Sequence, residues 1–379
     1  MLKSVFLKPC LTVCSIVILT TTILSGCSSS SSSSTPTTPK ENYNGPGSKW
    51  DITLTGGTTG DFNIDHYQTS DLQNPDYNIQ GPYVRQSSGF VTLTVGTVTN
   101  YIGTNGPLVG DTAWAVEAPG YAFLLKPTSG DQIIPMVESG NCPTADMTGN
   151  FVVVKKDLTN NGDSGADLAG NDFFGTFNYA VATGITSLPV LKAITAGFPD
   201  IAADTLPAGT CANGIMTFTD TILYLTTNGG GIVHLGVATP NDDTDDSFLF
   251  ALSQKAITNV NNLDGNYAGI LYDQNATIGQ QIQPVTLACT SGSCTGNLVS
   301  DVTTGAAQAG TSAAVNLTGT VDSIANGLIT GTISFGSTLG NLACMADIDS
   351  LSSGKKIISC VGQSPDNTAN MFNVIFVSI

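Results

Sequence analysis

The side chains best suited to chemistry lie in one oxygen-rich segment. Residues 157–172 read DLTNNGDSGADLAGND, and the candidate ligands in it are Asp157, Asn161, Asp163 and Asp167. Calcium takes about six to eight hard oxygen ligands, and loops with closely spaced carboxylates and glycine turns supply them. The segment is therefore a candidate calcium site, and calcium is the only cofactor that the sequence suggests.

A simpler interpretation of the same segment stays open. Thr159 occupies the third position, and Leu168 stands where an EF-hand loop carries a bidentate glutamate. The flanking stretches FVVVKK and FFGTFNYAV have the composition of strands. Residues 157–172 would then be a long, solvated hairpin loop without a metal.

The same loop contains Gly-Asp-Ser-Gly at 162–165, which resembles the nucleophile region of trypsin-like serine proteases. That family continues with glycine and proline, whereas this chain continues with Ala166 and Asp167. A nucleophilic serine needs a base held by an acid, and the upstream histidine, His66, does not stand in the small-residue setting that the family uses. A weak divalent site is the other chemistry open to His66, with the nearby carboxylates of Asp61, Asp65 and Asp71.

Catalysis has no further support in the sequence. Only three glutamates occur, Glu41, Glu117 and Glu138, and the aspartates cluster in turn-like segments. No glycine-rich phosphate loop follows a strand and opens a helix. We therefore expect a protein without an enzymatic activity, although a site scattered over several loops would escape such spacing rules.

Six cysteines beyond Cys27 indicate disulfides, because the count is even. A hairpin centred on Ser352 places Cys344 opposite Cys360, and opposed residues of a strand pair lie close enough for a bridge. A tight turn, TSGS, separates Cys289 from Cys294, so we expect these two cysteines to pair as well. By elimination, Cys142 then pairs with Cys211.

The N-terminus carries the features of an export signal. Lys3 and Lys8 precede an apolar core at 11–24, which is shorter than the roughly 20 residues of a membrane span. The core ends in Leu24-Ser25-Gly26-Cys27, which resembles the lipobox of bacterial lipoproteins. The resemblance implies cleavage before Cys27 and acylation of that cysteine, with palmitate as one of the chains. Because Ser28 follows rather than aspartate, it also implies sorting to the outer membrane, with the body facing the periplasm or the cell surface.

Composition limits the partners. The formal net charge is −17, so phosphate groups would be repelled and nucleic-acid binding is not expected. Residues 27–48 are rich in serine, threonine and proline and lack apolar periodicity, as a flexible tether does. The expected partners are a membrane, reached through the lipid on Cys27, and a protein or small molecule that the sequence does not identify.

An internal repeat organises the rest of the chain. DMTGNFVVVKKD at 146–157 is similar to NLDGNYAGILYD at 262–273, and each copy is followed later by a strongly apolar strand. In the last unit, alternation of apolar and polar residues predicts eight strands: 265–272, 281–289, 294–301, 313–321, 327–335, 341–349, 355–361 and 370–378.

The fold class that follows is all-β, built from tandem antiparallel up-and-down barrels or rolled sheets with little helix. One short helix is expected at 188–198. The expected domains are a signal peptide at 1–26, the tether at 27–48, and β units at 49–138, 139–258 and 259–379. The start of the last unit, LDGNY, weakly resembles the Gly-x-aromatic start of lipocalin-like barrels.

Two functions from different classes fit these features. The first is a lipid-anchored envelope protein whose β domains serve binding, adhesion or structure. The second is a lipocalin-like carrier of a small apolar or sugar-like ligand, which requires a hollow barrel lined mainly by apolar side chains. A filled interior would favour the first function, so the contents of the barrels distinguish the two.

Overall fold

The computed structural model describes residues 41–44, 50–67, 73–101, 107–118, 121–129, 133–138, 140–155, 173–188, 192–193, 204–206, 208–217, 221–225, 231–235, 247–253, 257, 259–273, 280–319, 329–348, 354–364 and 371–379. Their regular elements are β-strands and one short 3-10 helix, η2 (Val260–Leu263). None of the helices in this part of the chain has the length and apolarity needed to cross a bilayer. The all-β prediction is confirmed.

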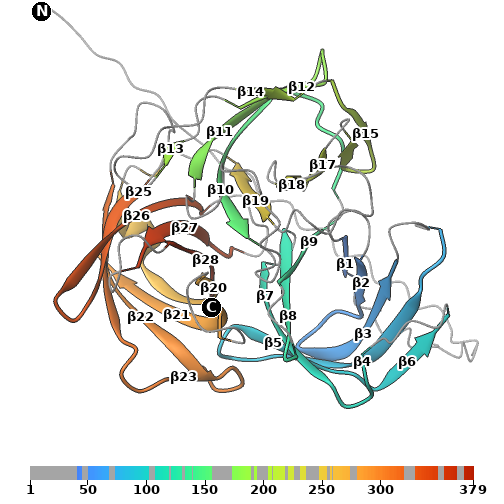
Figure 1. Cartoon of the computed structure of the whole chain (residues 1–379), viewed down its shortest axis with the longest axis horizontal. Coiled ribbons are helices and arrows are strands. Elements are labelled where there is room, and N and C mark those ends of the chain that lie inside the picture. Colours follow the sequence, from blue (N-terminus) through green and yellow to red (C-terminus); the bar gives the residue numbers. More distant parts are fainter. Residues whose placement is uncertain are drawn as a thin grey trace, which may run out of the picture. The chain divides into compact units, whose positions relative to one another are not determined.

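The first sheet forms a closed antiparallel ring, which we call barrel 1 (Figure 1). The order is β3-β2-β1-β9-β8-β7-β5-β4, β3 pairs with β4 to close the ring, and β6 adds to β4. Its strands are β1 (Glu41–Asn44), β2 (Trp50–Leu54), β3 (Thr59–His66), β4 (Tyr77–Arg85), β5 (Phe90–Thr94), β6 (Thr97–Asn100), β7 (Thr112–Ala118), β8 (Ala122–Pro127) and β9 (Ile134–Glu138).

The second sheet, sheet 2, is antiparallel and does not close through hydrogen bonds between its described strands. Its order runs from β14 at one edge to β15 at the other, with β13 paired to β11. Its strands are β10 (Met147–Lys155), β11 (Phe173–Ala180), β12 (Ile185–Leu188), β13 (Lys192–Ala193), β14 (Asp204–Leu206), β15 (Thr210–Ala212), β16 (Ile215–Thr217), β17 (Thr221–Leu225), β18 (Gly231–Leu235) and β19 (Ser247–Ser253).

The third sheet closes into a second ring, barrel 3, through the pairing of β21 with β22. The eight strands expected there are present, and one expected at 281–289 is observed at Ile282–Thr290. Its strands are β20 (Gly265–Asp273), β21 (Ile282–Thr290), β22 (Ser293–Asp301), β23 (Ala306–Ala307), β24 (Ala313–Gly319), β25 (Ile329–Phe335), β26 (Thr338–Asp347), β27 (Ile357–Gln363) and β28 (Met371–Ser378).

The sequence repeat marks equivalent strands. The first copy of the motif lies in β10, which pairs with the next strand, β11, and with the last strand of its sheet, β19. The second copy lies in β20, which pairs with β21 and β28 in the same way. Strand β1 also joins its successor to the last strand of its sheet. In each sheet, the strand that comes first in the sequence therefore pairs with both the second strand and the last strand.

Three disulfides are present, and the pairs are those expected. Cys344–Cys360 and Cys289–Cys294 each join directly opposed residues of a strand pair, with Cα atoms 4.0 Å apart. All four of these cysteines belong to the buried cluster inside barrel 3. Cys142–Cys211 connects the segment before β10 to β15, at an edge of sheet 2.

The closing strand β28 is apolar on both faces because each face packs on a different core. Phe372, Val374 and Phe376 belong to the cluster inside barrel 3. The alternate residues Ile375 and Val377 belong to a cluster that contains buried side chains from all three sheets. This is the packing that a strand without polar alternation predicts.

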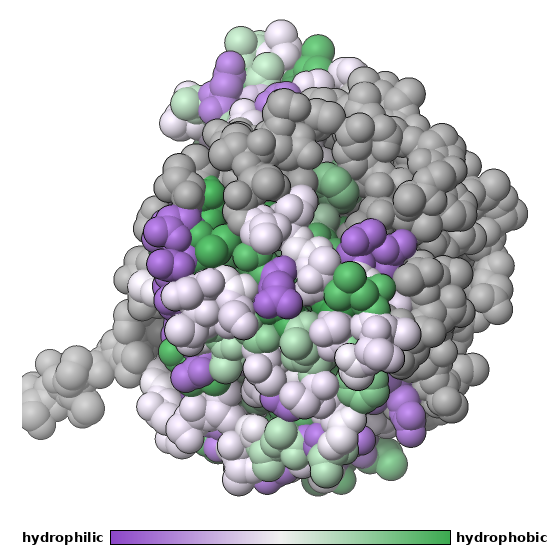
Figure 2. Space-filling view, turned by 90° about the vertical axis from the view of Figure 1, so that its left-hand side faces the viewer, coloured by the Kyte–Doolittle hydropathy of each residue, from purple (hydrophilic) through white to green (hydrophobic). Residues whose placement is uncertain are grey.

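The exposed faces carry few charges. Figure 2 shows one face on which strongly hydrophilic residues are scattered among residues of intermediate hydropathy. Charged residues make up 11% of the sequence, so threonine, serine, glycine and asparagine cover much of the strand surface instead. Exported β proteins often have this composition.

Two expectations need correction. Strand β1 (Glu41–Asn44) lies inside the segment assigned to the tether, and its Tyr43 is fully buried. With a single apolar residue, the strand has no periodicity to reveal it. The helix expected at 188–198 is also wrong where the structure can test it, because Leu188 ends β12 and residues 192–193 form β13. The rest of that segment lies outside the described residues.

Removing the disulfides of barrel 3 tests their contribution to stability. Loop-entropy arguments predict a loss of about 3 kcal/mol for Cys344→Ala/Cys360→Ala and about 2 kcal/mol for Cys289→Ala/Cys294→Ala, because the second bridge closes a shorter loop. The measurement is urea denaturation followed by circular dichroism. Equal losses, or a larger loss for the shorter loop, would contradict this interpretation.

Candidate functional site

Barrel 1 contains a cavity of about 540 Å³ at one end. Cavities of this size hold small organic ligands in other proteins. Its described lining consists of Trp50, Phe62, Ile64, His66, Tyr77, Ile79, Leu93, Val95, Pro107, Leu108, Asp111, Thr112, Ala113, Leu125, Pro127, Ser129 and Ile134. The wall is thus mainly apolar, with a small number of polar side chains.

Strand register brings three aromatic side chains of this wall together. Trp50 begins β2, His66 ends β3 and Tyr77 begins β4, so antiparallel pairing puts all three at the same end of the barrel. Trp50 lies opposite His66, and His66 lies opposite Tyr77. Directly opposed residues point to the same face of a sheet, which here is the barrel interior.

The aromatic rings form a continuous wall. The His66 ring stacks on Tyr77 with centroids 4.6 Å apart, and it meets Trp50 edge-on at 4.3 Å. Behind it, His66 Nδ1 lies 2.7 Å from Oδ1 of Asp76, whose side chain is only 2% exposed. Burial, and then the negative charge of Asp76, raise the pKa of the Tyr77 hydroxyl. The imidazole is therefore held in place from behind by a carboxylate.

The loop at 107–111 contributes to the same end of the barrel. The backbone N–H of Leu108 donates to Oδ2 of Asp111 at 2.8 Å, and the N–H of Val95 donates to the carbonyl of Asp111 at 2.8 Å. Gly110 has a φ of 95°, a conformation that favours glycine. These contacts fix Asp111 beside the cavity and leave the Leu108 side chain 73% exposed.

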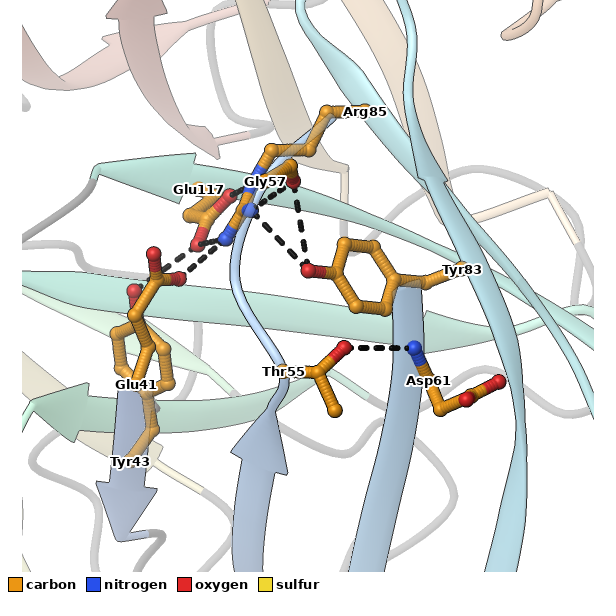
Figure 3. Close-up of polar contacts among 8 residues, drawn as sticks. All are labelled: Glu41, Tyr43, Thr55, Gly57, Asp61, Tyr83, Arg85 and Glu117. Carbon is orange, nitrogen blue, oxygen red and sulfur yellow. Dashed lines mark hydrogen bonds and ion pairs between the residues drawn. The ribbon is translucent and has the colours of Figure 1, made fainter. Parts of the chain in front are cut away.

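Beyond the cavity, barrel 1 is closed by a partly buried ionic cluster, the Arg85 cluster, shown in Figure 3. Arg85 Nε donates to Oε2 of Glu117 at 2.6 Å and one Nη donates to Oε1 at 2.6 Å, so the contact is bidentate. The same nitrogen also donates to Glu41. Tyr43 donates its hydroxyl to Glu117 at 2.9 Å, and the Tyr83 ring centroid lies 5.1 Å from the guanidinium carbon.

Register explains why these groups meet. Glu41 and Tyr43 share the inner face of β1, Tyr83 and Arg85 that of β4, and Glu117 lies on the inner face of β7, in line with the buried Ala115. Glu117 is 4% exposed, Arg85 21% and Glu41 28%. Arg85 is the only arginine of the chain, and its two carboxylate partners are two of the three glutamates.

The electrostatics of the cluster keep its arginine charged. Burial by itself would lower the pKa of Arg85, but the hydrogen bonds and charge of Glu117, with the charge of Glu41, outweigh burial and raise it. Burial raises the pKa of Glu41, although the charge of Arg85 opposes this. Burial, and then the charge of Glu117, also raise the pKa of Tyr43, which therefore remains a donor.

Side chains fill the interior of barrel 3 more completely than that of barrel 1. Its interior cavity measures about 110 Å³ and is lined almost entirely by apolar atoms, among them those of Leu317, Val374 and Cys360. A shallower hollow of about 250 Å³ shares Leu271 and Phe372 with it. At one end Tyr267, which follows the LDG of the repeat motif, donates its hydroxyl to the carbonyl of Leu263 in η2 at 2.5 Å.

The candidate calcium ligands Asp157, Asn161, Asp163 and Asp167 lie outside the described residues, and so does the candidate lipidation site Cys27. Within the described ranges, His, Cys, Asp and Glu residues do not gather in groups of three or more that could hold a metal. His66 does not meet Asp61 or Asp65 as a divalent site would require, because these alternate with it along β3 and lie on the outer face. Asp71 lies outside the described residues.

Asp65 instead belongs to a polar strip on the outer face of barrel 1. It lies directly opposite Asp51 and accepts a hydrogen bond from Asn78 Nδ2 at 2.7 Å. Burial and the charge of Asp65 raise the pKa of Asp51 to about 6, and a hydrogen bond from Tyr67 opposes the rise. The side chain of Asp51, whose pKa is raised, therefore lies on the outer face of barrel 1 and does not contribute to the cavity.

Sequence patterns did not point to the cavity or to the Arg85 cluster. Arg85 is separated from its carboxylate partners by 32 and 44 residues, and local periodicity carries no such information. One signal was present. A single arginine and two rare glutamates occupy positions of the same parity as buried apolar residues in β1, β4 and β7, and buried charges require partners.

Comparisons with known proteins give little further guidance. No protein-family model matches this chain, and no curated protein matches it. One similar solved structure is a protein of unknown function from the DUF3598 family of Nostoc punctiforme, with 10% identity, 62% of this chain and 95% of that chain covered, and a TM-score of 0.22. Another is a mutant of the vaccine antigen transferrin-binding protein B from Haemophilus parasuis, with 10% identity, 90% and 76% covered, and a TM-score of 0.24.

Replacing the arginine tests the Arg85 cluster. Arg85→Met should lower the stability of barrel 1 by about 3 kcal/mol, because it leaves the buried Glu117 carboxylate without its counter-charge. Both tryptophans, Trp50 and Trp114, lie in this barrel, so urea denaturation followed by tryptophan fluorescence reports on it.

Two further variants separate charge from packing. Glu41→Gln should cost about 1 kcal/mol or less, because the Glu41 side chain is partly solvated. Arg85→Met/Glu117→Leu should recover part of the loss, since no buried charge remains. If the double variant is no more stable than Arg85→Met alone, the unpaired carboxylate is not the cause.

Proposed function

We propose that the chain is a lipid-anchored protein of the bacterial envelope whose barrel 1 binds a small, mainly apolar ligand. The open half of barrel 1 carries this proposal. The cavity of about 540 Å³ lies within the range of small-molecule sites, and its wall is mainly apolar, with polar groups from residues such as His66, Asp111 and Ser129. Barrel 3, with about 110 Å³ inside, serves in this proposal as a structural unit.

The geometry favours binding over hydrolysis. A carboxylate behind an imidazole, as in Asp76 and His66, can orient a general base. The serine on the cavity wall, Ser129, follows β8, which lies four strands away from β3 around the ring. The His66–Asp76 pair is therefore better placed to hold a hydrogen-bonding group of a ligand than to activate that serine.

The anchor in this proposal has its support in the sequence. Lys3 and Lys8, the apolar core and Leu24-Ser25-Gly26-Cys27 occur in the order that a lipoprotein signal requires. Two or more acyl chains hold a protein stably at a bilayer, whereas a single chain does so only marginally. The residues between Cys27 and β1 then act as the tether, and the outer membrane is the proposed location.

Titration with an uncharged fluorescent probe tests the proposed ligand site. N-phenyl-1-naphthylamine should bind the mature protein saturably, with one site in barrel 1, because its rings match an apolar cavity. Ala113→Phe should weaken this binding about tenfold or more, since a ring at this lining position occupies the cavity; a tenfold change corresponds to about 1.4 kcal/mol.

Ala313→Phe is the matched control. Ala313 begins β24 and lines the hollow of barrel 3, as Ala113 lines that of barrel 1, and both are partly exposed. This variant should bind the probe as the unchanged protein does, and circular dichroism checks that both variants fold. Absence of saturable binding, or equal losses in both variants, would refute a ligand site in barrel 1.

Mass spectrometry of the N-terminal peptide tests the anchor. Protein extracted from the membranes of a producing bacterium should begin at Cys27 and carry acyl chains on it. Cys27→Ser should abolish acylation and leave an unprocessed chain that still carries its signal segment, because neither the lipid nor the processing that depends on it can form. A mature N-terminus at another residue, without lipid, would overturn the anchor and leave the cavity proposal unaffected.

A further inference from the structure

The charges around the barrel 1 cavity select among apolar ligands, and this inference rests on the proposed binding site. The described lining contains no lysine or arginine, whereas Asp111 contributes a carboxylate directly. Asp76 places a second carboxylate behind His66.

The described basic residues of barrel 1 lie elsewhere, and Lys49, which precedes Trp50 in the chain, lies outside the described residues. Arg85 belongs to the cluster that closes the barrel beyond the cavity and binds two carboxylates. Lys126 alternates with the inward-facing Leu125 and Pro127 along β8, and its ammonium donates to the carbonyl of Pro127 at 2.7 Å. Neither cation is placed to neutralise an anionic head group in the cavity.

The aromatic wall is a second feature of the cavity that favours a cationic ligand. Trp50 and Tyr77 both line the cavity, with ring centroids 6.2 Å apart. The faces of aromatic rings, tryptophan above all, attract ammonium groups, and the attraction is stronger where the site excludes water. Opposite them, Leu93, Leu125 and Ile134 provide an aliphatic surface for an uncharged body.

We propose that the barrel 1 cavity binds a small organic cation with an apolar body, such as an arylalkylamine. The ammonium group lies toward Asp111 and the aromatic wall, and the apolar part fills the space between Ile79, Leu93 and Leu125. A carboxylate ligand of the same size is disfavoured, because it would enter beside the Asp111 carboxylate, and the described lining offers no lysine or arginine to pair with it.

Three ligands with the same ring system and different head groups test this proposal. 1-Naphthylmethylamine, 1-naphthalenemethanol and 1-naphthoate are titrated against the mature protein with bound N-phenyl-1-naphthylamine, and displacement gives their relative affinities. The amine should bind most tightly, and about tenfold or more tightly than the carboxylate. The ratio should shrink at high salt, because part of it is a solvent-accessible charge effect.

Two variants that each remove one negative charge test whether the preference for the amine arises at Asp111. Asp111→Asn should reduce the amine-to-carboxylate ratio severalfold, while its side-chain oxygen can still accept the Leu108 N–H. Asp61→Asn removes the same charge from an exposed position on the outer side of β3, and should leave the ratio unchanged. Trp50→Leu should weaken the amine more than the alcohol, because only the amine gains from the ring face.

The outcomes separate this inference from the proposed function. If the probe binds and Ala113→Phe prevents it, but the carboxylate displaces the probe as well as the amine does, the cavity binds ligands and the preference for cations is wrong. If Asp61→Asn changes the ratio as much as Asp111→Asn, a general charge effect replaces the local one and the inference fails. If the probe itself does not bind, the proposed function fails first.

Discussion

The contact between the Arg85 guanidinium and the carboxylates of Glu117 and Glu41 holds barrel 1 together at the point where its ring is weakest. Among the residues that the structure describes, strand β1 pairs with β9 through two residue pairs, Tyr43–Glu138 and Asn44–Val137. Arg85 connects β1 to β4 and β7 across the interior, and Tyr43 adds a hydrogen bond to Glu117. Because these groups fill one half of the barrel, the other half can remain hollow without losing the ring.

The two closed barrels use their interiors differently. In barrel 3, two disulfides between directly opposed strands and the rings of Phe372 and Phe376 occupy the core, and the remaining space is close to that of a single small ring. In barrel 1, Tyr43, Tyr83 and the Arg85 cluster occupy one end, whereas the other end leaves a cavity between the aromatic wall of Trp50, His66 and Tyr77 and smaller side chains such as Ala113 and Val95. The same ring of eight strands thus gives one structural unit and one candidate ligand site.

Sequence reasoning succeeded where the information is local. Alternation along AVNLTGTV predicts the buried face of β24, Val315 and Leu317, and opposed positions in a hairpin predict Cys344–Cys360. It failed for β1, where Tyr43 is the only apolar residue, and for β13, where local helix propensity competes with pairing to β11. Position in a sheet can override propensity, and a four-residue strand has little pattern to show.

The cavity could not be predicted because it is a property of the whole ring. Its size depends on side chains from seven strands and on the 107–111 loop, so no single segment reveals it. The Arg85 cluster similarly joins residues that are distant in sequence. The rarity of arginine and glutamate in this chain was the signal available, since a fold with few charges must pair those that it buries.

X-ray diffraction from crystals of the mature protein is the most direct measurement of the central claim, that barrel 1 is hollow at one end and closed by Arg85 at the other. The account predicts solvent or ligand density bounded by Trp50, His66 and Tyr77, and a guanidinium in contact with both Glu41 and Glu117 inside the ring. Side chains packed throughout the space beside Trp50, or an Arg85 directed into solvent away from both carboxylates, would contradict it.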